Sequence, residues 1–535
     1  MELSQKSLET VKQWERAGFA LSHYNREAVG TVTKKSPEWL HLGAGNIFRA
    51  FIANLQETLL NTDRTDKGII VAEGFDYEIV EKIYRPKDNL SVLVTLKSDG
   101  AIEKTVIGSI VESLVMDTEH ETDWQRLEEI FRAASLKMVS FTITEKGYCL
   151  TGPDGNFLRQ VAEDMKQGPD NPKSYMGKLT ALLYARYKAG AYPLALVSMD
   201  NCSKNGKRLY EAVYELANSW VANKLVGSGF LAYIADPEQV SFPWSMIDKI
   251  TPRPDESVKK MLKDSGFDDV ETLVTSKNTY IAPFVNAEEP QYLVIEDCFP
   301  NGKPPLEKAG VLFTSRETVE RVEKMKVSTC LNPLHTTLAV FGCLLGYQRI
   351  SEEMKNPDLR RLVEKIGYTE GLPVVVNPGI IDPKAFIDEV LQVRIPNPFM
   401  PDTPQRIATD TSQKLGVRFG ETIKAYRDSA DKDVSELQGI PLVLAGWCRY
   451  LMGVDDEGEH FTLSPDPMLE ETVKYVEGIS LGENRDFHKE LYPLLSNADI
   501  FGVDLYEAGL GEKVEAYFAE LVSGKGAVKK TLANV

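Results

Sequence analysis

A strand, a glycine turn and a helix follow one another directly between residues 38 and 60. The apolar run that begins at Trp39 ends at Gly43-Ala44-Gly45, and apolar residues then recur with helical spacing up to Leu59. In a dinucleotide-binding fold, the first glycine permits the tight turn and the second lets a pyrophosphate approach backbone N–H groups at the helix N-terminus. This order of elements predicts a parallel α/β sheet with a dinucleotide site at the turn.

The glycine motif is incomplete, because Phe48 occupies the position of the third glycine. A Gly-x-Gly sequence after a strand also occurs in plain turns. Arg49, on the first helical turn, is expected to add a positive charge near the phosphates. A second apolar run ends at Glu73 and is followed by Asp76. We expect Asp76 to accept hydrogen bonds from the adenosine ribose, with Glu73 as the less well placed alternative, and an acid there favours NAD over NADP.

Strand and helix patterns alternate along the first half of the chain. The strand patterns cover residues 90–96, 105–111, 138–144 and 193–198, and the helix patterns cover residues 123–134 and 177–189. Such alternation predicts a doubly wound, Rossmann-like sheet. Asp200 and Asn201 follow the last of these strands, at the end where such sheets bind ligands, although a plain turn is the alternative.

Helical patterns dominate after about residue 300, and a chain of 535 residues is too long for one hydrophobic core. The turn-rich run from Pro300 to Pro305 is a candidate linker. We therefore predict an α/β fold in two parts: a Rossmann-like NAD-binding domain over residues 1–295, and a mostly α-helical substrate and catalytic domain over residues 296–535. The cleft between the domains is expected to hold cofactor and substrate.

Polar and ionisable residues gather between Glu323 and His335. Glu323 and Lys326 are three residues apart, as are Asn332 and His335, so each pair shares a face if the segment is helical. The following residues, 336–347, are apolar enough for a buried helix. This stretch is the expected active site. The alternative is a lysine-rich turn that enters a buried helix and has no chemistry.

Composition excludes several classes of function. The net charge of −18 and the isoelectric point near 5.0 disfavour nucleic-acid binding, which needs clustered Lys and Arg. The chain has no apolar signal region and no long uninterrupted apolar run, so we expect no membrane partner and a cytoplasmic location. Neither the six cysteines nor the six histidines show metal-ligand spacing, so no metal site or disulfide framework is expected.

Several short motifs taken together resemble the long-chain mannitol dehydrogenase family of polyol and hexuronate oxidoreductases, over roughly residues 38–500. The motifs are Gly43-Ala-Gly45-Asn46-Ile-Phe48-Arg49-Ala50, Thr144-Glu145-Lys146-Gly147-Tyr148, Ser198-Met-Asp200-Asn201 with Asn205-Gly206, Phe242-Pro-Trp-Ser-Met-Ile-Asp248-Lys-Ile-Thr251-Pro252, Ile295-Glu296-Asp297-Cys-Phe-Pro300, Glu323-x-x-Lys326, Asn332-x-x-His335 and Arg406-Ile-Ala-x-Asp410-x-x-x-Lys414. A small-molecule sugar acid or polyol is the partner that this resemblance implies.

The resemblance implies zinc-independent hydride transfer between NAD and a secondary alcohol, with Lys326 as the general acid/base. Asn201 and Asn332 would donate hydrogen bonds to the developing alkoxide. His335 would orient the substrate, and Glu323 would assist proton exit. The implied cofactor contacts are Gly43, Gly45, Asn46, Phe48, Arg49, Asp76, Glu145 and Asp248, and the implied substrate contacts are Arg406 and Lys414.

The chain departs from the family pattern at the expected active site. The interval from Lys326 to Asn332 is one residue longer than usual, and Pro333-Leu334 replaces Gly-Ser. Lys324 is a competing base, but it breaks the Glu-x-x-Lys pairing. A lysine acts as a base near neutral pH only where burial or a neighbouring cation lowers its pKa. Two amide donors aimed at an alkoxide form an oxyanion hole, which makes a metal unnecessary.

The expected substrate is a hexuronate. Hexitols and hexonates differ at one end, CH₂OH against carboxylate, so discrimination needs a cation at that end. Lys204 stands where mannitol dehydrogenases usually carry histidine, although it could equally be a solvated loop lysine. Lys204, together with the sequence from Cys330 to His335, which differs from that of the mannitol dehydrogenases, favours reduction of D-fructuronate to D-mannonate, or of tagaturonate to altronate. The alternatives are a polyol dehydrogenase acting on fructose and mannitol, and an inactive NAD-binding regulator.

Overall fold

The computed structural model describes residues 1–535 and divides into two compact units. The first unit comprises Met1–Lys97 and Ala101–Glu320, and the second comprises Arg321–Val535 with the short turn Ser98–Gly100. This division falls within helix α11 (Arg316–Met325), whereas the boundary expected after residue 295 falls within strand β14 (Tyr292–Glu296).

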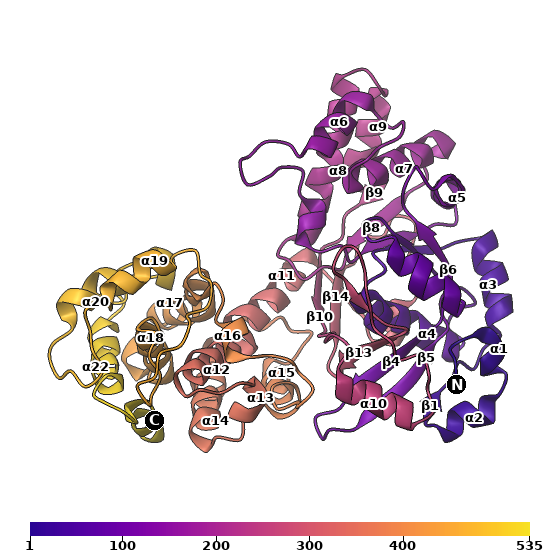
Figure 1. Ribbon diagram of the computed structural model, residues 1–535. Coiled ribbons are helices and arrows are strands. Elements are labelled where there is room, and N and C mark those ends of the chain that lie inside the picture. Colours follow the sequence, from indigo (N-terminus) through magenta and orange to yellow (C-terminus); the bar gives the residue numbers. More distant parts are fainter. The chain divides into compact units, whose positions relative to one another are not determined.

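A six-stranded parallel sheet forms the centre of the first unit (Figure 1). Its strands, in spatial order, are β6 (Ile110–Val115), β3 (Ile69–Glu73), β2 (Trp39–Leu42), β7 (Met138–Phe141), β8 (Leu194–Ser198) and β9 (Val240–Ser241). Numbered along the chain, this is the order 3-2-1-4-5-6 of a doubly wound Rossmann sheet, which confirms the predicted fold class. The strand order reverses between β2 and β7, directly beside the glycine turn.

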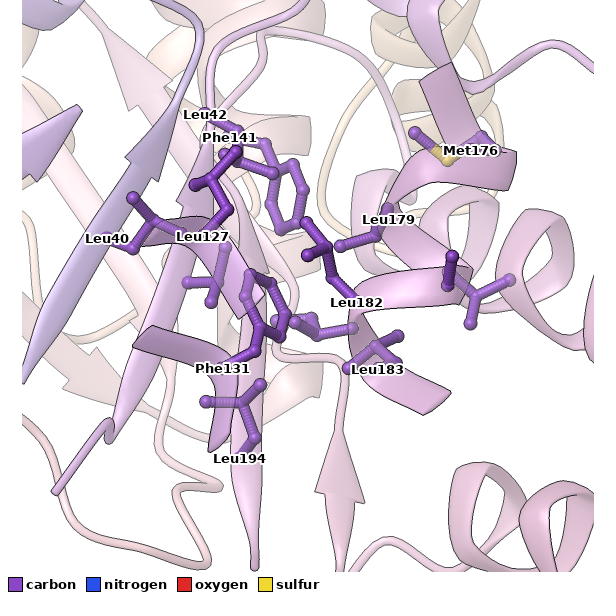
Figure 2. Packing of buried hydrophobic residues seen from close by; sticks show 14 of the residues in the cluster. Leu40, Leu42, Leu127, Phe131, Phe141, Met176, Leu179, Leu182, Leu183 and Leu194 are labelled. Carbon is purple, nitrogen blue, oxygen red and sulfur yellow. The ribbon is translucent and has the colours of Figure 1, made fainter. Parts of the chain in front are cut away.

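The two faces of this sheet have separate apolar cores, because successive strand residues point to opposite sides. Leu40 and Leu42 pack on the face covered by α5 (Glu121–Arg132) and α7 (Tyr175–Gly190) (Figure 2). Trp39 packs on the other face, against the helix that follows the glycine turn. Every residue of β2 is buried, as expected for a central strand of a parallel sheet with both faces covered.

The patterns at residues 90–96 and 105–111 were predicted to belong to the alternating sheet, and this prediction is wrong in part. β4 (Ser91–Leu96) and β5 (Ile102–Ile107) form an antiparallel hairpin in a separate sheet of order β1-β5-β4-β13. A short turn can join only antiparallel neighbours, since parallel strands need a long crossover. β5 ends at Ile107, directly before Gly108, and β6, which begins at Ile110, belongs to the Rossmann sheet.

The first unit has further strands, of which β1 and β13 belong to this second sheet, and further helices and turns. The strands are β1 (Phe19–Ala20), β10 (Ser245–Asp248), β11 (Leu273–Val274), β12 (Tyr280–Ile281), β13 (Phe284–Glu288) and β15 (Leu312–Thr314). The α-helices are α1 (Gln5–Leu8), α2 (Val11–Arg16), α3 (Arg26–Lys35), α4 (Ala53–Asn61), α6 (Arg159–Gln167), α8 (Asn205–Ala222), α9 (Ser228–Ala235) and α10 (Glu256–Asp264). The π and 3₁₀ turns are η1 (Phe48–Ile52), η2 (Val80–Tyr84), η3 (Arg85–Lys87), η4 (Glu145–Tyr148) and η5 (Leu306–Ala309).

The second unit is built of helices, drawn in orange and yellow in Figure 1. Its α-helices are α12 (Asn332–Leu344), α13 (Ile350–Glu353), α14 (Pro357–Glu364), α15 (Pro383–Glu389), α16 (Pro404–Ile407), α17 (Glu421–Arg427), α18 (Gly439–Tyr450), α19 (Leu469–Thr472), α20 (His488–Leu495), α21 (Ala498–Phe501), α22 (Gly511–Leu521) and α23 (Ala527–Ala533). Its π and 3₁₀ turns are η6 (Lys326–Cys330), η7 (Lys365–Gly371), η8 (Leu372–Val374), η9 (Val390–Arg394), η10 (Thr411–Gln413), η11 (Gly416–Gly420), η12 (Val434–Glu436) and η13 (Val473–Tyr475).

Helices α12 and α18 form the centre of the second unit. Every residue of α18 is buried, and Gly446 lets the two helices approach closely, because a Cβ there would lie 2.8 Å from the Phe341 ring. The helical run Arg316–Leu344, which includes α12, is long and apolar enough to cross a membrane. However, 83% of its most apolar window is buried inside the protein, as is usual for the core helix of a globular protein.

Candidate active site

The glycine turn after β2 has one crowded side and one open side. Gly43 has a φ of +108°, and a Cβ there would overlap the carbonyl oxygen of Thr142, so only glycine fits. At Gly45, by contrast, no atom lies within 4 Å of the position of a Cβ. Gly45 directly precedes the start of the helix at Asn46. Backbone N–H groups at such a helix start suit a pyrophosphate.

Phe48 and Arg49 are both buried beneath the turn. The Phe48 ring stacks on the His41 ring with centroids 4.4 Å apart, so the position of the third glycine is filled by a core aromatic. The Arg49 guanidinium donates to the carbonyl of Ala282 at 2.6 Å and to Asn46 Oδ1 at 2.8 Å. These hydrogen bonds connect the start of the helix to the segment at Ala282. A role for either side chain toward the cofactor stays a prediction.

The two acids near the end of β3 have different partners. Glu73 accepts hydrogen bonds from the backbone N–H groups of Ala44, Phe75 and Asp76, and burial raises its pKa. Asp76 accepts one hydrogen bond, from the Thr275 hydroxyl at 2.6 Å. Its other carboxylate oxygen is buried without a partner. An unpaired buried acceptor of this kind fits a ribose hydroxyl, which would donate to it.

Asp200 links the segments that follow β7 and β8 through hydrogen bonds to its carboxylate. Its carboxylate accepts from the backbone N–H groups of Ile143 and Thr144, at 3.0 and 2.8 Å, and from the Tyr148 hydroxyl. Burial raises the pKa of Asp200. Thr144 has a φ of +66°, which is costly for a β-branched residue and is sustained by these bonds. The side chain of Asp200 therefore stabilises the backbone of the turn after β7.

Asn201 is exposed at the end of β8, and the backbone beside it is fixed by Asn205. The buried Asn205 amide donates to the carbonyls of Asp200 and Ser245, both at 3.0 Å, and accepts from the Ser245 N–H. Lys204 has a φ of +55° and an exposed side chain at the start of α8.

Two further predicted cofactor residues lie near the same edge of the sheet. Glu145 is half exposed, in the turn after β7, and forms an ion pair with Arg208 at 2.8 Å. Asp248 is buried at the end of β10.

In the second unit, a π turn separates the predicted base from the predicted amide. Lys326 begins η6, and the N–H of Leu331 donates to the Lys326 carbonyl five residues earlier. A π turn takes one more residue than an α turn, so it accommodates the extra residue between Lys326 and Asn332 within one nearly continuous helix. Asn332 then begins α12, half buried.

The two candidate lysines differ in environment. Lys326 is buried, with 6% of its surface exposed. Lys324 is half exposed and forms an ion pair with Glu421 at 2.8 Å. Glu323, half buried, lies three residues before Lys326 on α11. This contrast agrees with the preference for Lys326, whose catalytic role stays a prediction.

His335 lies among positive charges on the first turn of α12. Burial lowers its pKa to about 3, and the charges of Arg418, Arg394 and Arg406 act in the same direction. Its Nε2 lies 3.5 Å from a carboxylate oxygen of Asp402, which also pairs with Arg406. The lowered pKa favours a neutral imidazole at His335, whose substrate-orienting role stays a prediction.

Lys414 and Arg418 complete this cluster. Lys414 donates to the carbonyl of Thr409 at 2.5 Å, and burial together with the charge of Arg418 lowers its pKa. Arg418 donates to the Thr336 hydroxyl, and burial lowers its pKa to about 10. Arg418 and Asp402 were not singled out from the sequence. The four-residue interval from Lys414 to Arg418 was the available signal, since it puts both cations on one helical face.

The structure thus brings the predicted residues together in two groups, one in each unit. The glycine turn, Asp76, Glu145 and Asn201 belong to the carboxyl edge of the Rossmann sheet. Within the second unit, His335 lies in the same cluster as the predicted substrate contacts Arg406 and Lys414. No group of three or more His, Cys, Asp or Glu side chains placed to hold a metal ion occurs within residues 1–535.

A Rossmann sheet with this glycine turn and its acid is typical of dinucleotide-dependent dehydrogenases. Comparison with family models narrows the class. The mannitol dehydrogenase Rossmann domain matches residues 37–308, and the mannitol dehydrogenase C-terminal domain matches residues 318–522. The chain belongs to the mannitol dehydrogenase family, and it is an oxidoreductase that uses a nicotinamide cofactor.

Individual relatives agree with this assignment over the whole length. The D-mannonate oxidoreductase of Thermotoga maritima is 53% identical over 537 residues, which cover 100% of this chain and 99% of the relative. The structure of a D-sorbitol dehydrogenase in substrate-free form matches with a TM-score of 0.80 at 25% identity, covering 96% of this chain and 98% of that one. The Pseudomonas fluorescens mannitol 2-dehydrogenase ternary complex with NAD and D-mannitol matches with a TM-score of 0.68 at 26% identity, covering 100% and 99%.

Proposed function

We propose that the protein interconverts a six-carbon keto sugar acid and the corresponding sugar acid with NAD(H) and without a metal ion. D-fructuronate and D-mannonate are the preferred pair, and tagaturonate and altronate are the closely related one. The observation that carries the substrate is the charge around His335, where Arg418 and Lys414 make no ion pair. A substrate carboxylate would supply the missing negative charge. The name of the Thermotoga maritima relative supports the same pair.

The first unit is proposed to bind NAD. The open side of Gly45 would admit the pyrophosphate, and the unpaired oxygen of Asp76 would accept from the ribose. The Asp76 charge would repel the 2′-phosphate of NADP, so NAD is the proposed cofactor. When bound, the nicotinamide accepts hydride from the alcohol or donates it to the ketone. The structure of a family member in complex with NAD supports this choice.

The proton is proposed to move through Lys326. Its amino group would take the proton of the substrate hydroxyl during oxidation and return it during reduction, with Glu323 assisting its exit. The amides of Asn201 and Asn332 would donate to the oxygen as its charge develops. Neutral His335 would hold an adjacent hydroxyl. These groups provide acid/base and electrostatic stabilisation from side chains alone.

A polyol is the second candidate substrate. The matched mannitol 2-dehydrogenase structure contains D-mannitol, and Arg406 and Lys414 belong to the pattern shared across the family. In that case these cations would bind hydroxyl groups. We also propose a cytoplasmic location, which the six unpaired cysteines support, because free thiols persist in a reducing compartment.

Steady-state kcat/KM for D-fructuronate, tagaturonate and fructose, each with NADH, tests the proposal. We expect at least one keto acid to exceed fructose by about 100-fold or more, as for a site that pairs a buried charge. A higher kcat/KM for fructose would identify a polyol dehydrogenase.

A further inference from the structure

We infer that Arg418 is the specificity-determining residue that binds the carboxylate of the substrate, and this inference rests on the proposed function. Arg418 lies at the middle of the π turn η11, and its Nη1 donates to the hydroxyl of Thr336. Thr336 directly follows His335 on α12. The guanidinium therefore reaches the same turn of helix that carries the predicted substrate-orienting imidazole.

The π turn that carries Arg418 is held rigidly. Gly416 and Gly420 flank it, and both pack against the backbone at the end of α21. A Cβ at Gly416 would lie 3.0 Å from the Gly502 nitrogen, and one at Gly420 would overlap the Phe501 carbonyl oxygen. Because neither glycine can be replaced without moving the backbone, the position of Arg418 is set by the core. A binding group on a rigid support loses little entropy when it meets its ligand.

Not every cation near Arg418 forms an ion pair, although the charges of Asp410 and Asp466 also act on Lys414. Arg406 has a carboxylate partner in Asp402, but neither Arg418 nor Lys414 has one. Arg418 uses one of its five N–H donors, on a neutral hydroxyl. A largely buried guanidinium without a counter-ion is costly, and burial lowers its pKa accordingly. A bound carboxylate would remove that cost, because it matches the planar fork of the guanidinium with two hydrogen bonds.

A structural role is the competing explanation, in which Arg418 only ties η11 to α12 through Thr336. The two explanations differ in what they predict for substrates that lack the carboxylate. A carboxylate-binding residue changes the ratio of activities toward the keto acid and the keto sugar. A structural residue changes both activities by the same factor and lowers stability.

The experiment compares Arg418→Met, Arg418→Lys and Thr336→Val in the full-length protein. We expect Arg418→Met to lower the ratio of kcat/KM for D-fructuronate to kcat/KM for fructose by about 100-fold or more, and Arg418→Lys to restore part of it because it keeps the charge. Thr336→Val should change the ratio much less, since it removes only the hydroxyl partner. Arg427→Met is the matched control, because Arg427, the last residue of α17, is half exposed and pairs with the adjacent Asp428.

Two outcomes would overturn the inference. One is an equal loss of both activities in Arg418→Met, and the other is an unchanged ratio. If the wild-type protein reduces neither keto acid, the proposed function fails, and calorimetric binding of D-mannonate then tests Arg418 separately. Equal affinity of the wild type and Arg418→Met for D-mannonate would reject the inference in that case, whereas weaker binding by the variant supports it.

Discussion

The carboxylate of Glu73 accepts a hydrogen bond from the backbone N–H of Ala44 at 2.7 Å, so the acid at the end of β3 holds the glycine turn that follows β2. Its other oxygen accepts from the N–H groups of Phe75 and Asp76. Both carboxylate oxygens of Glu73 therefore already accept hydrogen bonds from the backbone. The unpaired oxygen of Asp76 is therefore the acceptor that we propose for the ribose, and the two acids are proposed to have separate roles.

Replacing Asp76 tests this division. Asp76→Ser should narrow the preference for NADH over NADPH by about 10-fold or more, because it removes both the charge that repels a 2′-phosphate and a charged hydrogen-bond acceptor. The ratio of kcat/KM for the two coenzymes is the measurement. Glu73→Gln is the comparison: it should lower the thermal unfolding midpoint and leave coenzyme preference nearly unchanged. A wild type that prefers NADPH would show that Asp76 is not the ribose acceptor.

The two glycines of the turn should respond differently to alanine. Gly43→Ala should destabilise the protein strongly, because its positive φ and the nearby Thr142 carbonyl leave no room for a methyl group. Gly45→Ala should fold normally, since no atom lies within 4 Å, but it should weaken NADH binding by blocking the approach of the pyrophosphate. Calorimetric unfolding and fluorescence titration with NADH check the pair. Tight NADH binding by Gly45→Ala would place the cofactor elsewhere.

Much of the first unit was predictable because its central strands follow simple rules. The run from Trp39 to Leu42 is mostly apolar and wholly buried, as in a parallel strand with both faces covered, and Gly43 marks its turn. The hairpin of β4 and β5 was misassigned because the choice of strand partner depends on the tertiary arrangement. Its mostly apolar sequence at residues 90–96 is compatible with a strand of either sheet.

The second unit was harder to predict in detail. Residues 411–427, within the part expected to be helical, form η10, η11 and α17 in place of one regular helix, and Gly416 and Gly420 pack there against another backbone segment. The π turn at Lys326 was also outside the reach of periodicity, since i→i+5 bonding has no distinct residue pattern. Arg418 was missed for a related reason: its significance depends on Thr336, which is distant in the sequence.

The two candidate lysines provide a direct comparison. Lys326→Ala should lower kcat by at least about 100-fold, the range for loss of a general acid/base, while NADH binding stays near the wild-type value. Lys324→Ala should retain most of the turnover, because that side chain is half exposed and already paired with Glu421. Stopped-flow or steady-state NADH oxidation checks both variants. Near-normal turnover in Lys326→Ala would move the role to Lys324.

Buried His41 should make stability depend on acid pH. Its ring nitrogens lie 2.6 Å from Ser140 Oγ and 2.8 Å from Thr142 Oγ1, and burial lowers its pKa to about 3 from an ordinary value of 6.5. Between pH 6.5 and about 3, His41 binds a proton in the unfolded chain but not in the folded protein. The free energy of unfolding should therefore fall as pH decreases toward 3, by about 1.4 kcal/mol per pH unit from this group.

His41→Gln isolates this contribution, because glutamine can donate and accept hydrogen bonds but does not titrate in this range. The difference in free energy of unfolding between wild type and variant should change with pH between 6.5 and 3, whatever its value at pH 7. Denaturant titrations at several pH values give this difference. A constant difference would mean that His41 is protonated in the folded state.

Glu353 should have the opposite pH dependence. It is fully buried on α13, both carboxylate oxygens lack hydrogen-bond partners, and a Cβ at Gly342 would lie 2.7 Å from its Cδ. Burial raises its pKa well above 4.5, so the folded protein keeps a proton that the unfolded chain releases. The free energy of unfolding should fall as pH rises above 4.5, by about 1.4 kcal/mol per pH unit, until the folded pKa is reached.

Glu353→Gln removes this pH dependence, so the variant should be more stable than wild type at pH 8 and gain little stability at pH 4.5. Calorimetric unfolding at both pH values makes the comparison, and a variant that is less stable than wild type at pH 8 would show that the Glu353 carboxylate is ionised and paired.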